Sequence, residues 1–156
     1  MKTTVTELTD QLVASYARAG GINHLDGVNL PAKSSVASIT VDLLRLLFPG
    51  FFDERTIHSA EIKMVTANLM DSLQGRLEDE IYKSLQYNCR SDSPETDLRG
   101  LANDLTCGFL SRLPTIRELL QTDAEAAFNG DPAALSKDEV ILAYPCMEAV
   151  AVQRMA

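Results

Sequence analysis

The longest helical pattern in the chain most strongly limits what it can fold into. It begins at about residue 53 or 59, and apolar side chains then recur at three- and four-residue steps as far as residue 87. A helix of about thirty residues is more than about 40 Å long. We therefore expect either the spine of a helical bundle or part of an oligomer interface. The apolar positions are Ile62, Val65, Leu69, Leu73, Leu77, Ile81 and Leu85.

A shorter helical pattern opens the chain. Thr4 and Glu7 have the spacing of a capping box, in which the threonine oxygen and the glutamate carboxylate each accept a backbone N–H. Gly20-Gly21 marks the end of this helix. The pattern predicts an amphipathic first helix whose apolar face carries Leu8, Leu12, Val13 and Tyr16.

A second helical pattern runs from residue 34 to an apolar corner. Ser34-Ser35 is expected to cap this helix, which ends at Phe48-Pro49-Gly50. Because Phe51 and Phe52 follow directly, we expect the corner to be buried against a neighbouring helix. A partner-binding patch is the alternative. The predicted inward positions are Val36, Ile39, Leu43, Leu46 and Leu47.

Two further helices follow the long one. Ser93-Pro94-Glu95 reads as a helix start, with serine as the cap and proline in the first turn. Leu113-Pro114 is expected to end this helix, and the next one covers residues 115–129. The predicted apolar stripe of the first of the two is Leu98, Leu101, Leu105, Phe109 and Leu110.

The last 34 residues, 123–156, form a zigzag of helices and corners. Asn129-Gly130 stops one helix and Asp131-Pro132 makes a corner, since the residue before proline disfavours helix. Ser136 and Glu139 fit a second capping box, and Tyr144-Pro145 starts a last helix. No internal repeat or useful β-alternation is present. The sequence thus predicts a single all-α domain over residues 1–156, a helical bundle of about six to seven helices with one long amphipathic helix.

Composition excludes several classes of partner and site. The 156 residues carry a net charge of −8, which disfavours binding to nucleic acid and to anionic membranes. The N-terminus is not a secretory signal and no stretch predicts a membrane span, so we expect a cytoplasmic protein. The two histidines, His24 and His58, lack a partner at metal-ligand spacing, and we expect no metal or cofactor.

The three cysteines are far apart and predict no disulfide framework. We expect reduced thiols, with at least two of the three packed as small apolar groups. Cys107 lies among Leu105, Phe109 and Leu110, which favours a core thiol over a nucleophile. No self-contained catalytic constellation appears in the sequence.

Asp131 is the carboxylate that stands out, because it lies at a corner between two helices. From the residues alone, the better interpretation is a turn or cap residue for the next segment.

The run from Asp123 to the end of the chain resembles the end of the N-terminal helical domain of serine O-acetyltransferases. The likeness is carried by D-P-A-A at 131–134, S-K-D-E-V-I at 136–141 and Y-P at 144–145, with departures at Cys146 and Gln153. The L-P at 30–31 and the L-L-F-P-G-F-F at 46–52 also resemble this family, whereas the likeness between residues 53 and 121 is thin.

The resemblance implies an N-terminal domain whose catalytic partner, a hexapeptide-repeat β-helix that binds acetyl-CoA, is absent from this chain. It implies that Asp131 contacts L-serine, or cysteine as feedback inhibitor, at the pocket edge. Arg154 matches a family arginine, for which we expect a structural role. By this interpretation the chain alone has no catalytic residues and no turnover, and it self-associates as a dimer of helical domains, part of a hexamer in the full-length family. The alternative is a stand-alone helical protein–protein interaction module without enzymatic activity.

Overall fold

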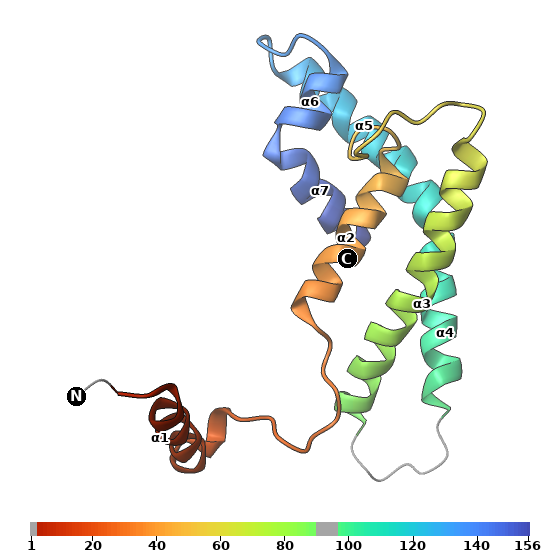
Figure 1. The fold of residues 1–156 in the computed structure, drawn as a ribbon. Coiled ribbons are helices and arrows are strands. Elements are labelled where there is room, and N and C mark those ends of the chain that lie inside the picture. The colour runs from red at the N-terminus through yellow and green to blue at the C-terminus, as the bar shows by residue number, and fades with distance from the viewer. Residues whose placement is uncertain (1–2, 90–96) are drawn as a thin grey trace.

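The computed structural model describes residues 3–89 and 97–156, and within those ranges the fold is all-α, as the sequence predicted. Figure 1 shows the helices gathered into an elongated bundle, with the first helix apart from it. The elements are α1 (Val5–Arg18), a 3₁₀ turn (Gly20–Ile22), α2 (Lys33–Leu47), α3 (Ile62–Asn88), α4 (Leu98–Ser111), α5 (Leu113–Gly130), α6 (Lys137–Ala143) and α7 (Pro145–Met155).

The long helix α3 is the spine of the bundle. It packs against α2 on one side and α4 on the other (Figure 1), and Leu73 near its middle is fully buried. It begins at Ile62, later than predicted. A turn comes first, held by the backbone N–H of His58, which donates to a Glu61 carboxylate oxygen at 3.1 Å. Of the two roles predicted for this helix, its contacts with α2 and α4 agree with the bundle spine, and Leu73 and Glu80 are its buried residues.

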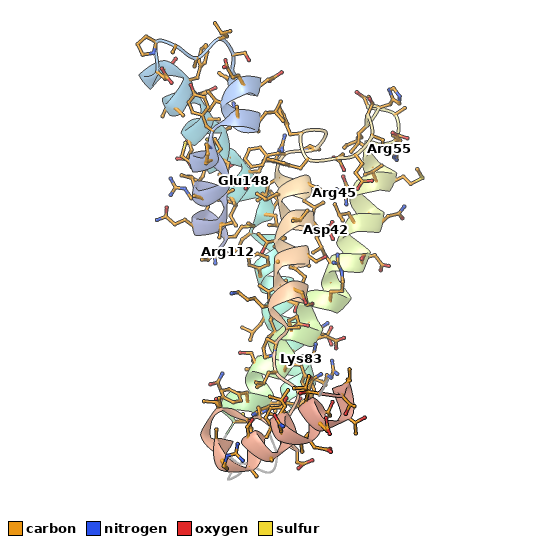
Figure 2. The ribbon with its side chains drawn as sticks, turned by 60° about the vertical axis from the view of Figure 1, so that its left-hand side comes forward. Asp42, Arg45, Arg55, Lys83, Arg112 and Glu148 are labelled. Atoms are coloured by element: carbon orange, nitrogen blue, oxygen red, sulfur yellow. The ribbon has the colours of Figure 1, made fainter. Side chains whose placement is uncertain are left out.

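An ion-pair cluster joins α2 to α3 at the surface. Asp42 on α2 accepts hydrogen bonds from Arg45, at 2.9 Å, and from Arg76 of α3, at 2.5 Å. Arg45 also donates to Asp53 at 2.8 Å, which fixes the chain after the corner. Figure 2 shows Asp42 and Arg45 one turn apart on α2.

The predicted apolar stripe of α4 is only in part its buried face, because Leu110 is buried but Leu101 and Leu105 are not. Ala102 and Thr106 have no exposed surface and Leu110 is nearly buried, whereas Leu101 and Leu105 are 40% and 47% exposed. Small side chains at a contact let two helix axes approach closely. The helix pair α3–α4 therefore meets on the small residues Ala102 and Thr106, and Leu101 and Leu105 lie at the margin.

The other half of the core lies where α5 crosses α2 and packs with α6 and α7. Only Arg112 separates α4 from α5, so the predicted break at Leu113-Pro114 is a bend between successive helices. Proline is tolerated there because the first turn of a helix leaves its N–H groups without helical partners anyway. The buried apolar residues of this half include Leu47, Ile116, Leu120, Ala124, Val140, Met147 and Ala151.

The apolar corner after α2 is packed, as expected. Phe48 is buried and its ring meets that of Phe52 edge-on, with centroids 5.8 Å apart. Gly50 has φ +88°, a left-handed backbone that favours glycine. The Arg117 guanidinium of α5 donates to the carbonyl of Leu47, one of the carbonyls that a helix end leaves free.

The cap predicted for α2 was wrong. The helix begins at Lys33, and the N–H of Ala32 donates to a Glu80 carboxylate oxygen of α3 at 2.9 Å. Lys83, labelled in Figure 2, donates to the other oxygen at 2.6 Å. Burial of Glu80 raises its pKa, but the hydrogen bonds from Lys83, Ala32 and Ser35 outweigh burial and keep the pKa below its ordinary value. Glu80 thus ties the start of α2 to the spine.

The first helix, α1, has the predicted capping box. The N–H of Thr4 donates to Glu7 at 2.8 Å, and the N–H of Glu7 donates to the Thr4 hydroxyl at 3.3 Å. Its apolar face is unburied, and Figure 1 shows α1 held away from the bundle by the segment that leads to α2. The exposed side chains of this face are Val5, Leu8, Leu12, Val13 and Tyr16.

All three cysteines are exposed, contrary to prediction. Cys107 follows the buried Thr106 by one residue, which turns its side chain about 100° around α4, away from the packed face. The predicted helix start at Ser93-Pro94-Glu95 lies outside the described residues. Within them α4 is capped by Asp97, whose carboxylate accepts the N–H of Gly100 at 2.9 Å. None of the helices in the described ranges has the length and apolar character that crossing a membrane requires.

Candidate functional site

The corner that carries Asp131 lies at the end of α5, where the sequence placed it. Asp131 caps α5, and its carbonyl accepts the N–H of Ala134 at 3.1 Å, which closes a tight turn over Pro132. The short helix α6 then folds back beside α5. Figure 1 shows α6 at the far end of the bundle from α1.

The cap of α6 is only partly the predicted capping box. The hydroxyl of Ser136 accepts the N–H of Glu139 at 3.1 Å, as expected. The Glu139 carboxylate accepts the N–H of Leu135 at 2.8 Å, one residue before the position that a capping box would use. Lys137 pairs with Glu125 of α5 at 2.8 Å, and this pair fixes α6 against α5.

Both oxygens of the Asp131 carboxylate accept a hydrogen bond within the chain. The N–H of Ala133 donates to Oδ1 at 2.9 Å, and the hydroxyl of Tyr144 donates to Oδ2 at 2.5 Å. An ionised carboxylate has about four acceptor sites, so about two remain for a ligand. Asp131 is partly exposed, which leaves those sites open to an approaching donor.

Tyr144 is the residue of this site that sequence reasoning missed. It lies between α6 and α7, thirteen positions after Asp131. The sequence feature that could have indicated this contact is the short distance between the two corners. Helix α6 has seven residues and is therefore about 10 Å long, so the corners at its two ends lie close together when the chain turns back. The sequence showed both corners but not their contact.

The hydrogen bond also sets the protonation of both partners. Donation from the Tyr144 hydroxyl, and then from the Ala133 N–H, lowers the pKa of the Asp131 carboxyl below its ordinary value. The same bond, with burial as a smaller cause, raises the pKa of Tyr144 to about 12. At neutral pH the pair is therefore a carboxylate and a neutral phenol that donates to it.

Chemically, this corner offers a fixed negative group suited to an ammonium or hydroxyl donor. Asp131 is not among the lining residues of four hollows in the described part of the chain. A cavity of about 230 Å³ involves α6, and its lining includes Phe48, Arg117, Lys137 and Ile141 but not Asp131. The corner can therefore contribute one wall of a pocket, and the described residues do not enclose a ligand there.

Arg154 has the structural position expected for it. Its guanidinium donates twice to the Asp123 carboxylate, at 3.0 Å and 2.9 Å, and so links α7 to α5. Fork-to-fork pairing of this kind fixes orientation as well as distance. Residues 3–89 and 97–156 contain no cluster of three His, Cys, Asp or Glu side chains able to hold a metal ion.

The chain is 31% identical over 131 residues to a protein of Synechococcus elongatus described as "Serine acetyltransferase, plasmid". The match covers 81% of this chain and spans only 41% of the length of that relative. No protein-family model matches the sequence. The chain is thus similar to a serine acetyltransferase over less than half of that protein's length.

Proposed function

We propose that this chain is the N-terminal helical domain of a serine O-acetyltransferase, which transfers an acetyl group from acetyl-CoA to L-serine in cysteine biosynthesis. The observation that carries the proposal is the 31% identity to a serine acetyltransferase across 81% of the chain. Asp131 adds physical support, because an ionised, partly exposed carboxylate suits the ammonium and hydroxyl of serine.

In this proposal the chain supplies one wall of the substrate pocket. The serine hydroxyl oxygen attacks the thioester carbon of acetyl-CoA, the carbon–sulfur bond breaks, and the hydroxyl proton passes through a base to the departing thiolate. The base and the acetyl-CoA site belong to a β-helix domain outside these 156 residues. Asp131 holds the amino acid, or cysteine as feedback inhibitor, at the pocket edge.

The gene and an activity assay test this proposal together. We expect the reading frame to continue past the codon for Ala156 into hexapeptide repeats. The longer product should acetylate L-serine and the 156-residue chain should not. A stop codon directly after Ala156 would favour a stand-alone interaction module, for which the exposed apolar face of α1 is the supporting observation. Turnover by the short chain, or none by the longer product, would also contradict the proposal.

We also propose that the chain pairs with a second copy of itself through α1. The apolar face of α1 is unburied, with Leu8 54% and Leu12 55% exposed. Glu7 and Asp10 lie toward the start of the helix and Arg18 at its end, so an antiparallel pair of α1 helices sets opposite charges against each other. The long helix is the other element considered for this role, but it contacts α2 and α4, whereas α1 has no buried residue.

Replacing Leu12 with glutamate is expected to convert a dimer to monomer. A charge in the middle of the apolar face has to be desolvated on pairing, which an interface core does not tolerate. Light scattering at high protein concentration measures the change. Gln11→Glu, on an adjacent exposed position of the same helix, adds the same charge and should leave the dimer intact. A wild-type chain that is monomeric at high concentration would contradict the pairing, as would equal effects of the two variants.

A further inference from the structure

We propose that Tyr144 is a positioning residue for Asp131, one that holds the carboxylate in a single orientation and leaves its free acceptor sites turned toward the amino-acid ligand. This inference rests on the proposed function, since it assigns a role at the same site. The observation that supports it is the 2.5 Å hydrogen bond from the Tyr144 hydroxyl to Oδ2 of Asp131, which does not depend on the similarity to a serine acetyltransferase.

Two donors on different oxygens restrict the carboxylate more than one donor would. The Ala133 N–H comes from the same turn as Asp131 and holds Oδ1 at 2.9 Å. Tyr144 comes from the far end of α6 and holds Oδ2, so the plane of the carboxylate is fixed between two separate parts of the chain. A carboxylate on an exposed corner otherwise rotates about its side-chain bonds, and ordering it would reduce ligand affinity.

Tyr144 is itself anchored, which a positioning residue requires. Its N–H donates to the carbonyl of Val140 at 3.3 Å, and its carbonyl accepts the N–H of Met147 at 3.0 Å. Pro145 follows it and fixes the backbone at the start of α7. Its side chain is half-buried against the core cluster. The Tyr144 backbone is therefore held on both sides, and this fixes the position from which the phenol donates to Asp131.

The protonation of the pair keeps the bond in one direction at neutral pH. The pKa of Tyr144 is raised to about 12, so the phenol stays a donor, and the lowered pKa of Asp131 keeps the carboxylate an acceptor. The ligand therefore meets a charged carboxylate with one oxygen already engaged. A compact group with several donors, such as the ammonium of an amino acid, suits the acceptor sites that remain.

The first arm of the test uses the 156-residue chain. Tyr144→Phe keeps the ring and removes the donor, and we expect the Asp131 carboxyl, followed by ¹³C NMR during a pH titration, to show a raised pKa. Tyr87→Phe, at a side chain 60% exposed, is the matched control and should leave that titration unchanged. Thermal unfolding of both variants shows whether the fold is retained. An Asp131 titration unchanged by Tyr144→Phe overturns the inference whatever the chain's function.

The second arm uses the longer enzyme that the proposed function requires. We expect Tyr144→Phe to raise the KM for L-serine about 5- to 10-fold with little change in kcat, the pattern of a lost binding interaction. In an Asp131→Asn background the same change should add little, because both act through one group. If Asp131→Asn raises KM and Tyr144→Phe does not, positioning by Tyr144 is wrong. If neither raises KM, the substrate role of Asp131 in the proposed function fails as well.

Discussion

Replacing Leu73 with alanine is expected to lower the free energy of unfolding by about 3–4 kcal/mol, since a fully enclosed leucine leaves a cavity that its neighbours only partly fill. For a domain of this size that corresponds to a fall of roughly 10 °C in the thermal midpoint. Chemical denaturation followed by circular dichroism gives the first quantity and calorimetry the second.

Leu105→Ala is the matched control, because it makes the same truncation on the neighbouring helix α4 at a side chain that is 47% exposed. We expect it to cost well under half as much, because a half-exposed leucine loses less burial and leaves no closed cavity. Equal losses for the two variants would show that α4 buries its leucine stripe, as the sequence first indicated, and that the α3–α4 contact described here is misplaced.

Replacing Asp131 with asparagine is expected to raise the KM for L-serine about 10- to 100-fold in the longer enzyme. A loss of affinity of this size corresponds to the free energy of a hydrogen bond to a charged group. Asparagine keeps one oxygen that can accept the Ala133 N–H, and its amide nitrogen, in place of Oδ2, can donate to the Tyr144 hydroxyl oxygen, so the variant removes the charge while both partners remain within reach. Inhibition by cysteine should weaken in parallel, because the same carboxylate is proposed to hold both amino acids. Steady-state kinetics at several serine and cysteine concentrations measure both effects.

Asp138→Asn provides the control for Asp131. Asp138 is an exposed carboxylate in the first turn of α6, close in sequence to the corner, and its replacement by asparagine removes the same unit of charge. The KM of the Asp138→Asn enzyme for L-serine should stay near that of the parent enzyme. Equal effects at the two positions would assign the result to overall charge, and unchanged kinetics in Asp131→Asn would reject the role proposed for Asp131.

Much of the fold followed from local signals in the sequence. The Thr4–Glu7 capping box and the corners at Asp131 and Tyr144 each depend on residues within a few positions of one another. The long helix also followed, because seven apolar residues recur at three- and four-residue steps between residues 62 and 85. Signals of this kind act within one turn of the backbone, and they hold whatever the rest of the chain does.

The features that the sequence did not reveal depend on partners far along the chain. The residue before α2, Ala32, donates its N–H to Glu80, 48 positions away, and α2 has no side-chain cap although Ser34-Ser35 predicted one. The buried face of α4 was chosen by fit to α3, which favours Ala102 and Thr106 over larger leucines. The bond between Tyr144 and Asp131 depends on α6 turning back on α5. Local patterns indicated the elements, and packing decided which side chains meet.

The bend at Arg112 has a mechanical consequence for the Asp131 corner. Helix α5 has 18 residues and is therefore about 27 Å long, with the bend at one end and the Asp131 carboxylate at the other. A tilt of α5 by about 5° at the bend would move the Asp131 end by about 2 Å, whereas a binding group must stay within about 0.5 Å of its working position. The Arg154–Asp123 and Lys137–Glu125 pairs join α7 and α6 to the half of α5 that ends at Asp131, and so they oppose such a movement.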